Sequence, residues 1–266
     1  TYCMKELPTW LQDYNKQKPA DKFYAQNWNT LYPIDSYTQS TADNKAYERK
    51  TRGEETPTFP HPLKLYAGKN YEIIKSTPHG NTMTLDLAKL AISAEKMGQG
   101  NATDFLAVSC SATDYVGHQY GPNSVEAEDT YLRLDKELES FFNYLDSKFG
   151  KNNYLFFLSA DHGAAHVAGF MTENKLPGGP FSEGPVIKLI NTAIEKEFNI
   201  KKAIESSGNG QLYFNRNVIK AAKADFDAIK ALAIDILREQ DEVFDAVDLS
   251  KLATITLPEQ IKKSLT

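Results

Sequence analysis

Several features that identify common protein classes are missing from this sequence of 266 residues. No run of apolar residues approaches the ~18 that a membrane-spanning helix needs, so we expect no membrane span. The net charge of −5 argues against a nucleic-acid-binding surface, which is usually basic. Only 2 cysteines are present, and two cysteines do not make a disulfide framework. We interpret Cys110 as a small apolar core residue at the end of a strand, rather than as one half of a Cys3–Cys110 disulfide.

The start of the chain also lacks the features of a natural N-terminus. The sequence begins with Thr1 instead of methionine, and residues 1–5 contain no apolar core of a signal peptide. We therefore expect the sequence to be one part of a longer polypeptide.

What is present fits a folded protein, because 41% of the residues are hydrophobic and can form a packed core. Residues 1–75 are polar, rich in aromatic side chains and interrupted by prolines, and this composition predicts a loop-rich cap or insertion segment. Within this segment His61 lies between Pro60 and Pro62, so we interpret it as an exposed loop residue.

A more regular pattern follows in the middle of the chain. Apolar residues at helical spacing predict a helix over residues 84–97 and a long amphipathic helix over residues 124–148. Two apolar segments, residues 103–110 and 153–160, flank the long helix and have the length of buried strands. This order of strand, helix and strand predicts two parallel strands of one sheet that is covered on both faces. We assign residues 76–185 to this central α/β core.

The last part of the chain, residues 186–266, has a different character. Helices are predicted over residues 186–198 and 224–238, and the turn sequence Gly208-Asn209-Gly210 predicts a β-hairpin between them. A further strand is predicted over residues 243–247. We interpret this region as a small α+β insertion subdomain, followed by a return to the core.

Each predicted strand of the central core is followed by an aspartate and a histidine. Asp114 and His118 come after the first strand, and Asp161 and His162 directly follow the second. Functional groups in open parallel sheets gather beyond the C-terminal ends of the strands, so we expect the two pairs to lie close together. Carboxylate oxygen and imidazole nitrogen are ligands that zinc accepts. The four residues are candidate metal ligands, and further ligands must come from elsewhere, because four do not complete two tetrahedral sites.

Each pair taken alone has a simpler interpretation. An aspartate at the end of a strand commonly caps a helix, and a histidine there is commonly an ordinary loop residue. The metal-site interpretation depends on the conjunction of the two pairs. Both follow predicted strands, both are next to glycine-containing loops, and one helix separates them along the chain.

Three segments together resemble the alkaline phosphatase superfamily. They are Thr113-Asp114-Tyr115-Val116-Gly117-His118, Gly121-Pro122-Asn123-Ser124 and Ala160-Asp161-His162-Gly163-Ala164-Ala165-His166. The resemblance is strongest over residues 76–170 and is closest to the bacterial phosphate-irrepressible alkaline phosphatases, near relatives of the nucleotide pyrophosphatase/phosphodiesterases. It implies an α/β/α sandwich with insertions, of which this chain holds a part, in a protein that is periplasmic or secreted.

The resemblance also implies a zinc-dependent phosphate monoester hydrolase that holds two zinc ions. In it, Asp114 and His118 bind one ion, and Asp161 and His162 bind the other. The threonine or serine nucleophile, an early aspartate ligand and a final histidine ligand of the family have no counterpart in this chain. We therefore expect a fragment that is inactive by itself. Its substrate is a phosphate ester, its partner is the remainder of the same polypeptide, and no nucleic acid is involved.

Two alternatives to this function are kept. A phosphodiesterase or nucleotide pyrophosphatase of the same superfamily is one, because the groups that select monoesters over diesters are expected in the missing part. A non-catalytic binding domain that has kept the fold is the other, although the presence of all four candidate ligands argues against it. A sulfatase is less favoured, since neither cysteine begins the nucleophile signature Cys-x-Pro-x-Arg.

Some other residues are assigned lesser roles. His166 and His79 are candidates for residues that support the metal ligands from behind. Asn81, Thr82 and Thr84 precede or open a predicted helix, so we interpret them as capping residues and not as nucleophiles.

Overall fold

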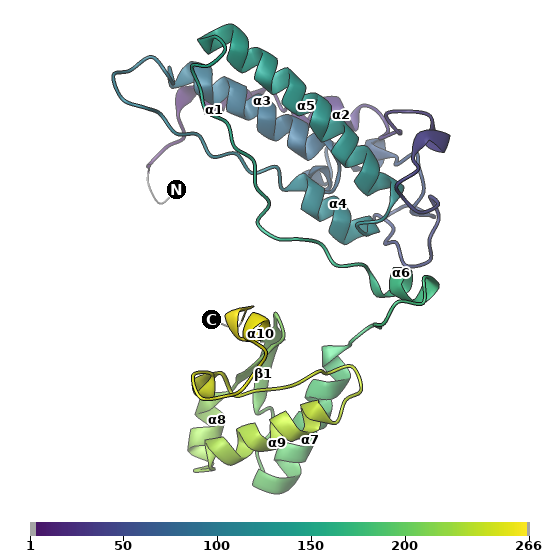
Figure 1. Ribbon diagram of the computed structural model, residues 1–266, viewed down its shortest axis with the longest axis vertical. Helices are drawn as coiled ribbons and strands as arrows, with labels where there is room; N and C mark the ends of the chain where they lie inside the picture. The colour runs from purple at the N-terminus through teal and green to yellow at the C-terminus, as the bar shows by residue number, and fades with distance from the viewer. Residues whose placement is uncertain (1–3, 265–266) are drawn as a thin grey trace. The chain divides into compact units, whose positions relative to one another are not determined.

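The computed structural model describes residues 4–264, which fall into two compact units, one up to Asn174 (unit 1) and one from Lys175 onward (unit 2) (Figure 1). The boundary predicted between residues 185 and 186 therefore falls inside unit 2. Residues 4–75 pack within the same unit as the helices that follow them.

Unit 1 is built mainly from helices. Its α-helices are α1 (Thr9–Lys16), α2 (Ala20–Tyr24), α3 (His79–Ala94), α4 (Ala112–Tyr120), α5 (Val125–Phe149) and α6 (Ala168–Glu173), and its short 3₁₀ helices are η1 (Ile34–Ser36), η2 (Leu63–Tyr66) and η3 (Tyr71–Ser76). The long helix α5 begins where the sequence predicts, because the Ser124 hydroxyl accepts a hydrogen bond from the backbone amide of Ala127. Acidic residues in its first turn favour the positive end of the helix dipole.

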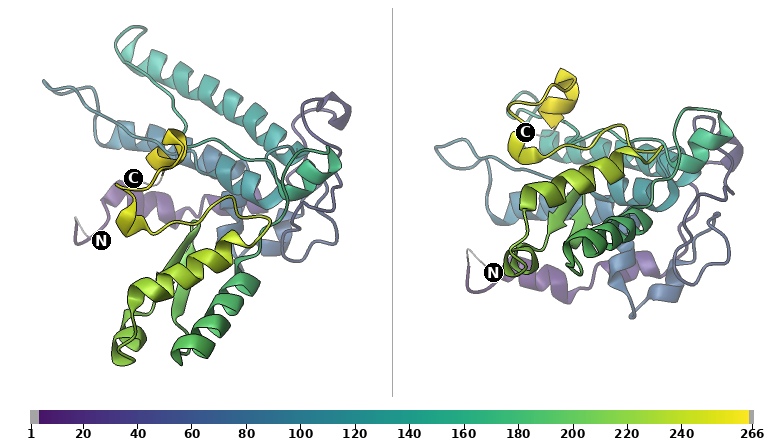
Figure 2. Two further views of the ribbon diagram at one scale, coloured as in Figure 1. Left: turned by 60° about the horizontal axis from the view of Figure 1, so that its bottom comes forward. Right: turned by 90° about the horizontal axis from the view of Figure 1, so that it is seen from below.

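Two apolar clusters hold unit 1 together. Helices α3 and α5 lie side by side and bury one cluster between them, made of Leu85, Ala88, Ile92, Phe141 and Leu145 (Figures 1 and 2). The other cluster joins α4 to the segment that was predicted to be a cap, and consists of Ala20, Tyr24, Trp28, Leu63, Tyr66, Val116 and Tyr120. This second cluster packs the N-terminal segment against α4.

The two segments predicted as parallel strands, residues 103–110 and 153–160, are extended but do not form a sheet. In the described part of the chain the only sheet is a two-stranded one in unit 2. The two segments do approach each other, with 6.4 Å between the ring centroids of Phe105 and Phe157. Their apolar side chains are largely exposed, with 74% for Phe105, 70% for Phe157 and 88% for Leu155. The prediction of a buried, hydrogen-bonded sheet is therefore wrong. Among the described residues neither segment pairs with a strand, and most of their apolar side chains stay exposed although Phe156 packs edge-on against Phe142 of α5.

Unit 2 contains the region of residues 186–266 for which an α+β subdomain is predicted. Its elements are α7 (Glu183–Phe198), β1 (Ile204–Gly208), β2 (Gln211–Phe214), α8 (Arg216–Ala221), α9 (Phe226–Arg238), the 3₁₀ helix η4 (Leu249–Lys251) and α10 (Glu259–Ser264). Strands β1 and β2 pair antiparallel, and Asn209 and Gly210 take positive φ values of 53° and 69° in the turn between them. The strand predicted over residues 243–247 does not form.

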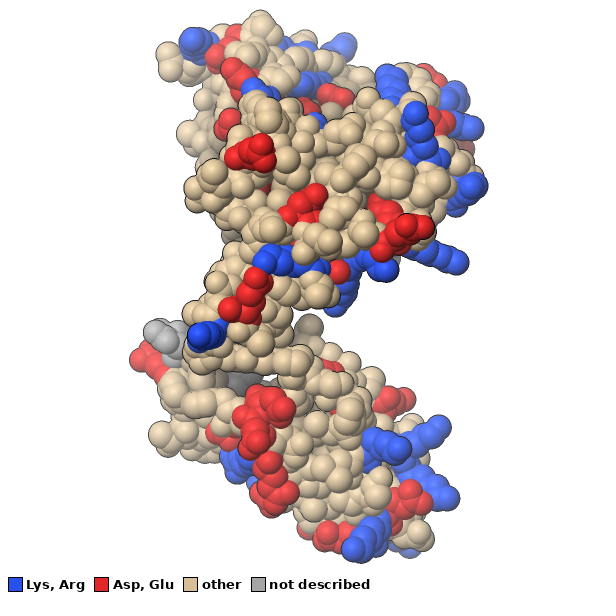
Figure 3. Space-filling model, turned by 90° about the vertical axis from the view of Figure 1, so that its right-hand side faces the viewer, with Lys and Arg blue, Asp and Glu red and all other residues tan. Residues whose placement is uncertain are grey.

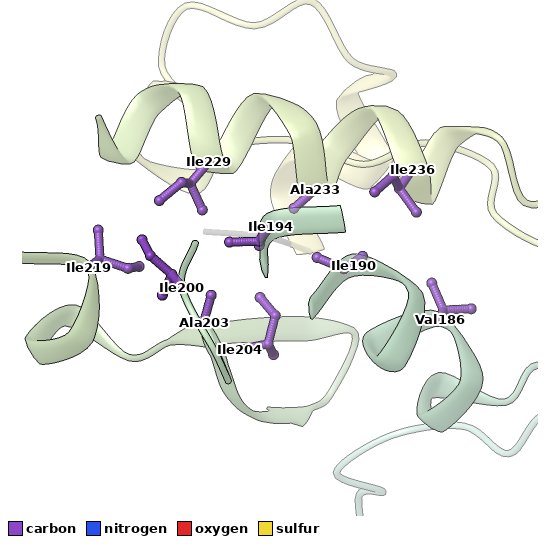
Figure 4. Packing of buried hydrophobic residues seen from close by; sticks show 10 residues of the cluster. All are labelled: Val186, Ile190, Ile194, Ile200, Ala203, Ile204, Ile219, Ile229, Ala233 and Ile236. Atoms are coloured by element: carbon purple, nitrogen blue, oxygen red, sulfur yellow. The ribbon is translucent and has the colours of Figure 1, made fainter. Parts of the chain in front are cut away.

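The core of unit 2 lies between α7, α9 and the hairpin. Figure 4 shows isoleucines from all three elements that point toward one another, including Ile190, Ile204 and Ile229. Helix α7 is followed by the C-cap residue Asn199, which takes the left-handed conformation with φ 56°. On the face of the molecule in Figure 3, acidic side chains lie among the basic ones in both units.

Candidate metal centre

Helix α4 carries the first predicted pair. Asp114 lies in its first turn and His118 in its last turn, four residues apart and therefore on one face of the helix. The Nε2 atom of His118 is 3.5 Å from Oδ1 of Asp114. On another side of the helix, Val116 and Tyr120 are buried and pack into the core of unit 1. Helix α4 is thus anchored by one face and presents the pair on another.

The second pair lies in the loop that follows residues 153–160. The Nε2 atom of His162 is 3.6 Å from Oδ2 of Asp161 and 3.8 Å from Oδ1 of Asp114. The four predicted residues therefore form a continuous series, Asp161, His162, Asp114 and His118, in which each neighbour is within 4 Å of the next. Segments about fifty residues apart in sequence contribute the two halves of this series.

The orientation of the His162 ring is set by the main chain. Its Nδ1 atom is 2.9 Å from the carbonyl oxygen of Gly163, and a carbonyl oxygen can only accept, so Nδ1 carries the hydrogen. The lone pair of the neutral ring is then on Nε2, the atom that faces Asp114. The hydrogen bond to Gly163, followed by the charges of Asp161 and Asp114, raises the pKa of His162.

The chemistry of these side chains suits a zinc ion, but each pair supplies only part of a coordination sphere. Two imidazoles and two carboxylates are ligands that zinc prefers in proteins. Their side chains are open to solvent, from 44% for Asp114 to 90% for Asp161. Within residues 4–264, no group of three or more His, Cys, Asp or Glu side chains is arranged to hold one metal ion. The residues therefore fit a centre in which each ion takes two ligands from this chain and others from outside it.

The two other predicted histidines have different surroundings. His166 is exposed, with Nδ1 2.8 Å from Oδ1 of Asn123 and its ring stacked on Phe170. His79 is buried against the ring of Phe23, and burial lowers its pKa to about 4. The described contacts of these two rings are thus with residues other than the four candidate ligands.

His61 is not the exposed loop residue that the flanking prolines suggested, so that prediction is wrong. Its side chain is 1% exposed and lies between Glu126 and Glu54, with Nε2 3.1 Å from Oε1 of Glu126. Backbone hydrogen bonds in both directions between His61 and Trp28 draw the loop into the core. Burial alone lowers the pKa of His61, but the hydrogen bonds and charges of the two glutamates outweigh it and raise the pKa to about 9.

Asn81, Thr82 and Thr84, which were interpreted as capping residues, make other contacts in the structure. Helix α3 begins at His79, directly after Pro78, so Asn81 and Thr84 lie inside the helix rather than at its N-cap. The Asn81 side chain is 1% exposed and reaches across to α4. The hydroxyl of Thr82 donates to Glu137 on α5, and that of Thr84 donates to the carbonyl of Gly80. The interpretation of these residues as N-terminal caps is therefore wrong.

Comparison with known proteins places the chain in a family. The model of the type I phosphodiesterase/nucleotide pyrophosphatase family matches residues 6–264. The chain belongs to this family. Among its relatives, alkaline phosphatase PhoV of Synechococcus elongatus is 52% identical over 100% of this chain and 48% of its own length. A protein of Myroides odoratus named as a calcium-transporting ATPase is 46% identical over 100% of this chain and 49% of its own length.

A solved structure of the same family confirms the fold. The crystal structure of wild-type alkaline phosphatase PafA superposes with a TM-score of 0.92 at 43% sequence identity, covering 98% of this chain and 50% of that one. PafA of Elizabethkingia meningoseptica is also among the relatives found by sequence. The chain thus has part of the alkaline-phosphatase-like α/β fold, as its sequence predicts, and spans about half the length of the curated relatives that it matches.

Proposed function

We propose that this chain carries part of the two-zinc active site of a phosphate monoester hydrolase, an alkaline phosphatase. The observation that carries the proposal is the series of Asp161, His162, Asp114 and His118, in which neighbouring side chains lie within 4 Å. Two of the relatives that match nearly the whole chain are named as alkaline phosphatases, which supports the same reaction.

Each ion has two proposed ligands in this chain. Asp114 and His118 hold one zinc ion from α4, and Asp161 and His162 hold the other from the loop. A bound zinc ion supplies Lewis acidity, which stabilises the negative charge that builds up on oxygen during phosphoryl transfer. The chain's own contribution is to orient these ligands. The hydrogen bond to Gly163 fixes the His162 ring so that the lone pair of Nε2 is available to a metal ion. The packing of Val116 and Tyr120 holds α4 in place.

The nucleophile and the remaining ligands come, in this proposal, from residues outside the chain. No segment of the sequence matches the threonine or serine nucleophile of the superfamily, and the chain spans about half of its relatives. The remainder of the polypeptide is also the proposed partner of the exposed apolar segments 103–110 and 153–160. Alone, the chain should hydrolyse no phosphate ester at a measurable rate and should bind zinc weakly.

A phosphodiesterase or nucleotide pyrophosphatase is the second candidate, because the description of the matching family model names those activities. The four proposed ligands serve either reaction, so a comparison of substrates decides between them.

For either activity a periplasmic or secreted location is proposed. Among the described residues no helix combines the length and apolar character needed to cross a bilayer.

A chimera tests the function directly. Residues 1–266 replace the matching half of PafA, and the purified protein is assayed with a chromogenic phosphate monoester and with the corresponding diester, with and without added zinc. We expect zinc-dependent hydrolysis of the monoester that exceeds that of the diester. The reverse preference supports the phosphodiesterase. A folded chimera that binds zinc but hydrolyses neither substrate supports the non-catalytic binding domain and contradicts the proposal.

Two matched histidine variants of the chimera test the assigned roles. His162→Ala removes a proposed ligand, and the expected loss of activity is more than about 100-fold, because even residues that only support ligands cost 10–100-fold. High zinc concentrations should restore part of it. His166→Ala removes another exposed histidine of the same loop, whose contacts are with Asn123 and Phe170, and should keep most of the activity. Equal losses from the two variants contradict the assignment of roles.

A further inference from the structure

The N-terminal end of α4 lacks a cap of its own. Ser111 occupies the N-cap position, but its side chain makes no capping hydrogen bond with the helix. The first amide groups of a helix have no partner within the helix, so an acceptor must come from elsewhere. Asp114 lies in this same first turn, and the direction of its carboxylate depends on how firmly the turn is held.

Asn81 of α3 supplies the missing acceptor. Its Oδ1 atom accepts a hydrogen bond of 3.2 Å from the backbone amide of Ala112, and its Nδ2 atom donates one of 2.9 Å to the hydroxyl of Thr113. Both partners directly precede Asp114. The Asn81 side chain is 1% exposed, so water does not compete for these two hydrogen bonds.

The two helices are in close contact at the same point. A Cβ atom built on Gly80 would lie only 2.9 Å from Cβ of Ala112 and 3.0 Å from the carbonyl oxygen of Ile74. Glycine is therefore required next to Asn81 for α3 to come this near to α4. The hydrogen bonds and the close packing are independent observations, and both fix the first turn of α4 against α3.

We infer that Asn81 is a positioning residue that holds the first turn of α4, and with it Asp114 and His118, in the arrangement that binds zinc. The inference rests on the proposed function, because it concerns the affinity of the proposed site. Asn81 acts through Ala112 and Thr113 and touches neither metal nor substrate. It has no such link to the loop of Asp161 and His162, so its loss should weaken one half of the centre selectively.

Zinc addition followed by NMR of the histidine rings tests the inference on the chain itself. The chain contains 5 histidines, and the ¹H–¹⁵N signals of His118 and His162 report the two halves separately. Zinc should shift both signals in the unmodified chain. In Asn81→Leu the zinc concentration at half-saturation should rise about tenfold for His118 and by less than about threefold for His162.

Three further variants separate positioning from stability. Asn81→Asp keeps an acceptor for Ala112, so its half-saturation for His118 should stay within about threefold of the unmodified chain. Thr113→Val removes only the Nδ2 partner and should weaken the His118 response in the same direction as Asn81→Leu. Ile92→Ala, a core change on the same helix, should lower the melting temperature without changing either zinc response.

Several results would overturn the inference. Suppose the zinc concentration at half-saturation of His118 is the same in the unmodified chain, in Asn81→Leu and in Thr113→Val. The hydrogen bonds of Asn81 then have no effect on zinc binding. A rise of the same size for His118 and His162, or the same rise in Asn81→Asp as in Asn81→Leu, assigns Asn81 a general packing role. If zinc shifts neither histidine in the chimera with PafA, which supplies the remaining proposed ligands, the proposed metal centre itself fails, and the inference fails with it.

Discussion

The Nε2 atom of His61 lies 3.1 Å from Oε1 of Glu126, and the two side chains are 1% and 0% exposed. On the other side of the ring, Nδ1 is 3.3 Å from Oε1 of Glu54. A buried carboxylate such as Glu126 is tolerated only where a charged or hydrogen-bonding partner compensates it. His61 is that partner, and it ties the loop of residues 54–62 to the first turn of α5.

Replacing His61 should therefore destabilise unit 1 strongly. His61→Ala leaves Glu126 buried without its basic partner and opens a gap beside Trp28 and Tyr120, and the expected loss is about 3–5 kcal/mol of unfolding free energy. Urea denaturation measures it. The control is His166→Ala, an exposed histidine, which should change stability by less than about 0.5 kcal/mol. A loss below about 1 kcal/mol for His61→Ala contradicts this account of the cluster.

The same cluster predicts how stability depends on pH. The pKa of His61 is raised to about 9, burial raises the pKa of Glu48 to about 7, and burial with the charge of Glu126 raises that of Asp43 to about 6. The folded state therefore holds protons that the unfolded chain has released, so stability falls as pH rises. Glu54, on the other side of the His61 ring, raises the pKa of His61 in the same direction as Glu126.

For His61 alone, the loss should occur between pH 6.5 and about 9 and should reach roughly 3 kcal/mol, at about 1.4 kcal/mol for each pH unit. Denaturation curves at several pH values measure it. His61→Gln keeps most of the ring's volume without a titrating group, and it should remove most of the decrease in this window. A stability that rises from pH 6.5 to 9 in the unmodified chain contradicts the sign of the shift.

The close contact between α3 and α4 predicts an unusual effect of alanine. In the interior of a helix, glycine to alanine normally stabilises by about 0.5–1 kcal/mol. Gly80→Ala should instead destabilise, by about 1–3 kcal/mol, because the new methyl group meets Ala112 and the carbonyl of Ile74. Gly184→Ala on α7 has open space around it and should be neutral or stabilising. Thermal unfolding of both variants checks the contrast, and a stabilising Gly80→Ala contradicts it.

The sequence predicts elements well where their signals are local. Apolar residues at helical spacing predict α5, and Gly208-Asn209-Gly210 predicts the hairpin. These signals act over a few residues and do not depend on distant contacts. The pairing of Asp114 with His118 is of the same kind, since it follows from helical spacing.

Features that depend on distant contacts were predicted less well. The prolines around His61 indicate a loop correctly, but its burial comes from Trp28 and Glu126, which are far away in sequence. Asn81 fits a cap by residue type, and its true partners lie on another helix. The apolar pattern of residues 103–110 indicates that the segment favours a buried position in a sheet. It does not show whether this chain provides the neighbouring strands.

The exposed segments 103–110 and 153–160 predict a difference in hydrogen exchange. Their backbone amides have no sheet partners among residues 4–264, so they should exchange fast in residues 1–266 alone. In the chimera with PafA the same amides should become strongly protected, because the other half can cover and pair with them. Mass spectrometry of both proteins measures it, with the amides of α9 as an internal standard that should not change. Equal exchange in the two proteins contradicts the proposed partner.

Each of the two compact units has a core made only of its own residues. The isoleucine cluster of unit 2 lies entirely within residues 186–236, and both clusters of unit 1 lie within residues 20–145. A substitution in one core therefore changes no packing contact in the other. In evolution, such independence lets one unit accumulate changes, or be exchanged between relatives, while selection on the proposed zinc ligands acts on the other unit alone.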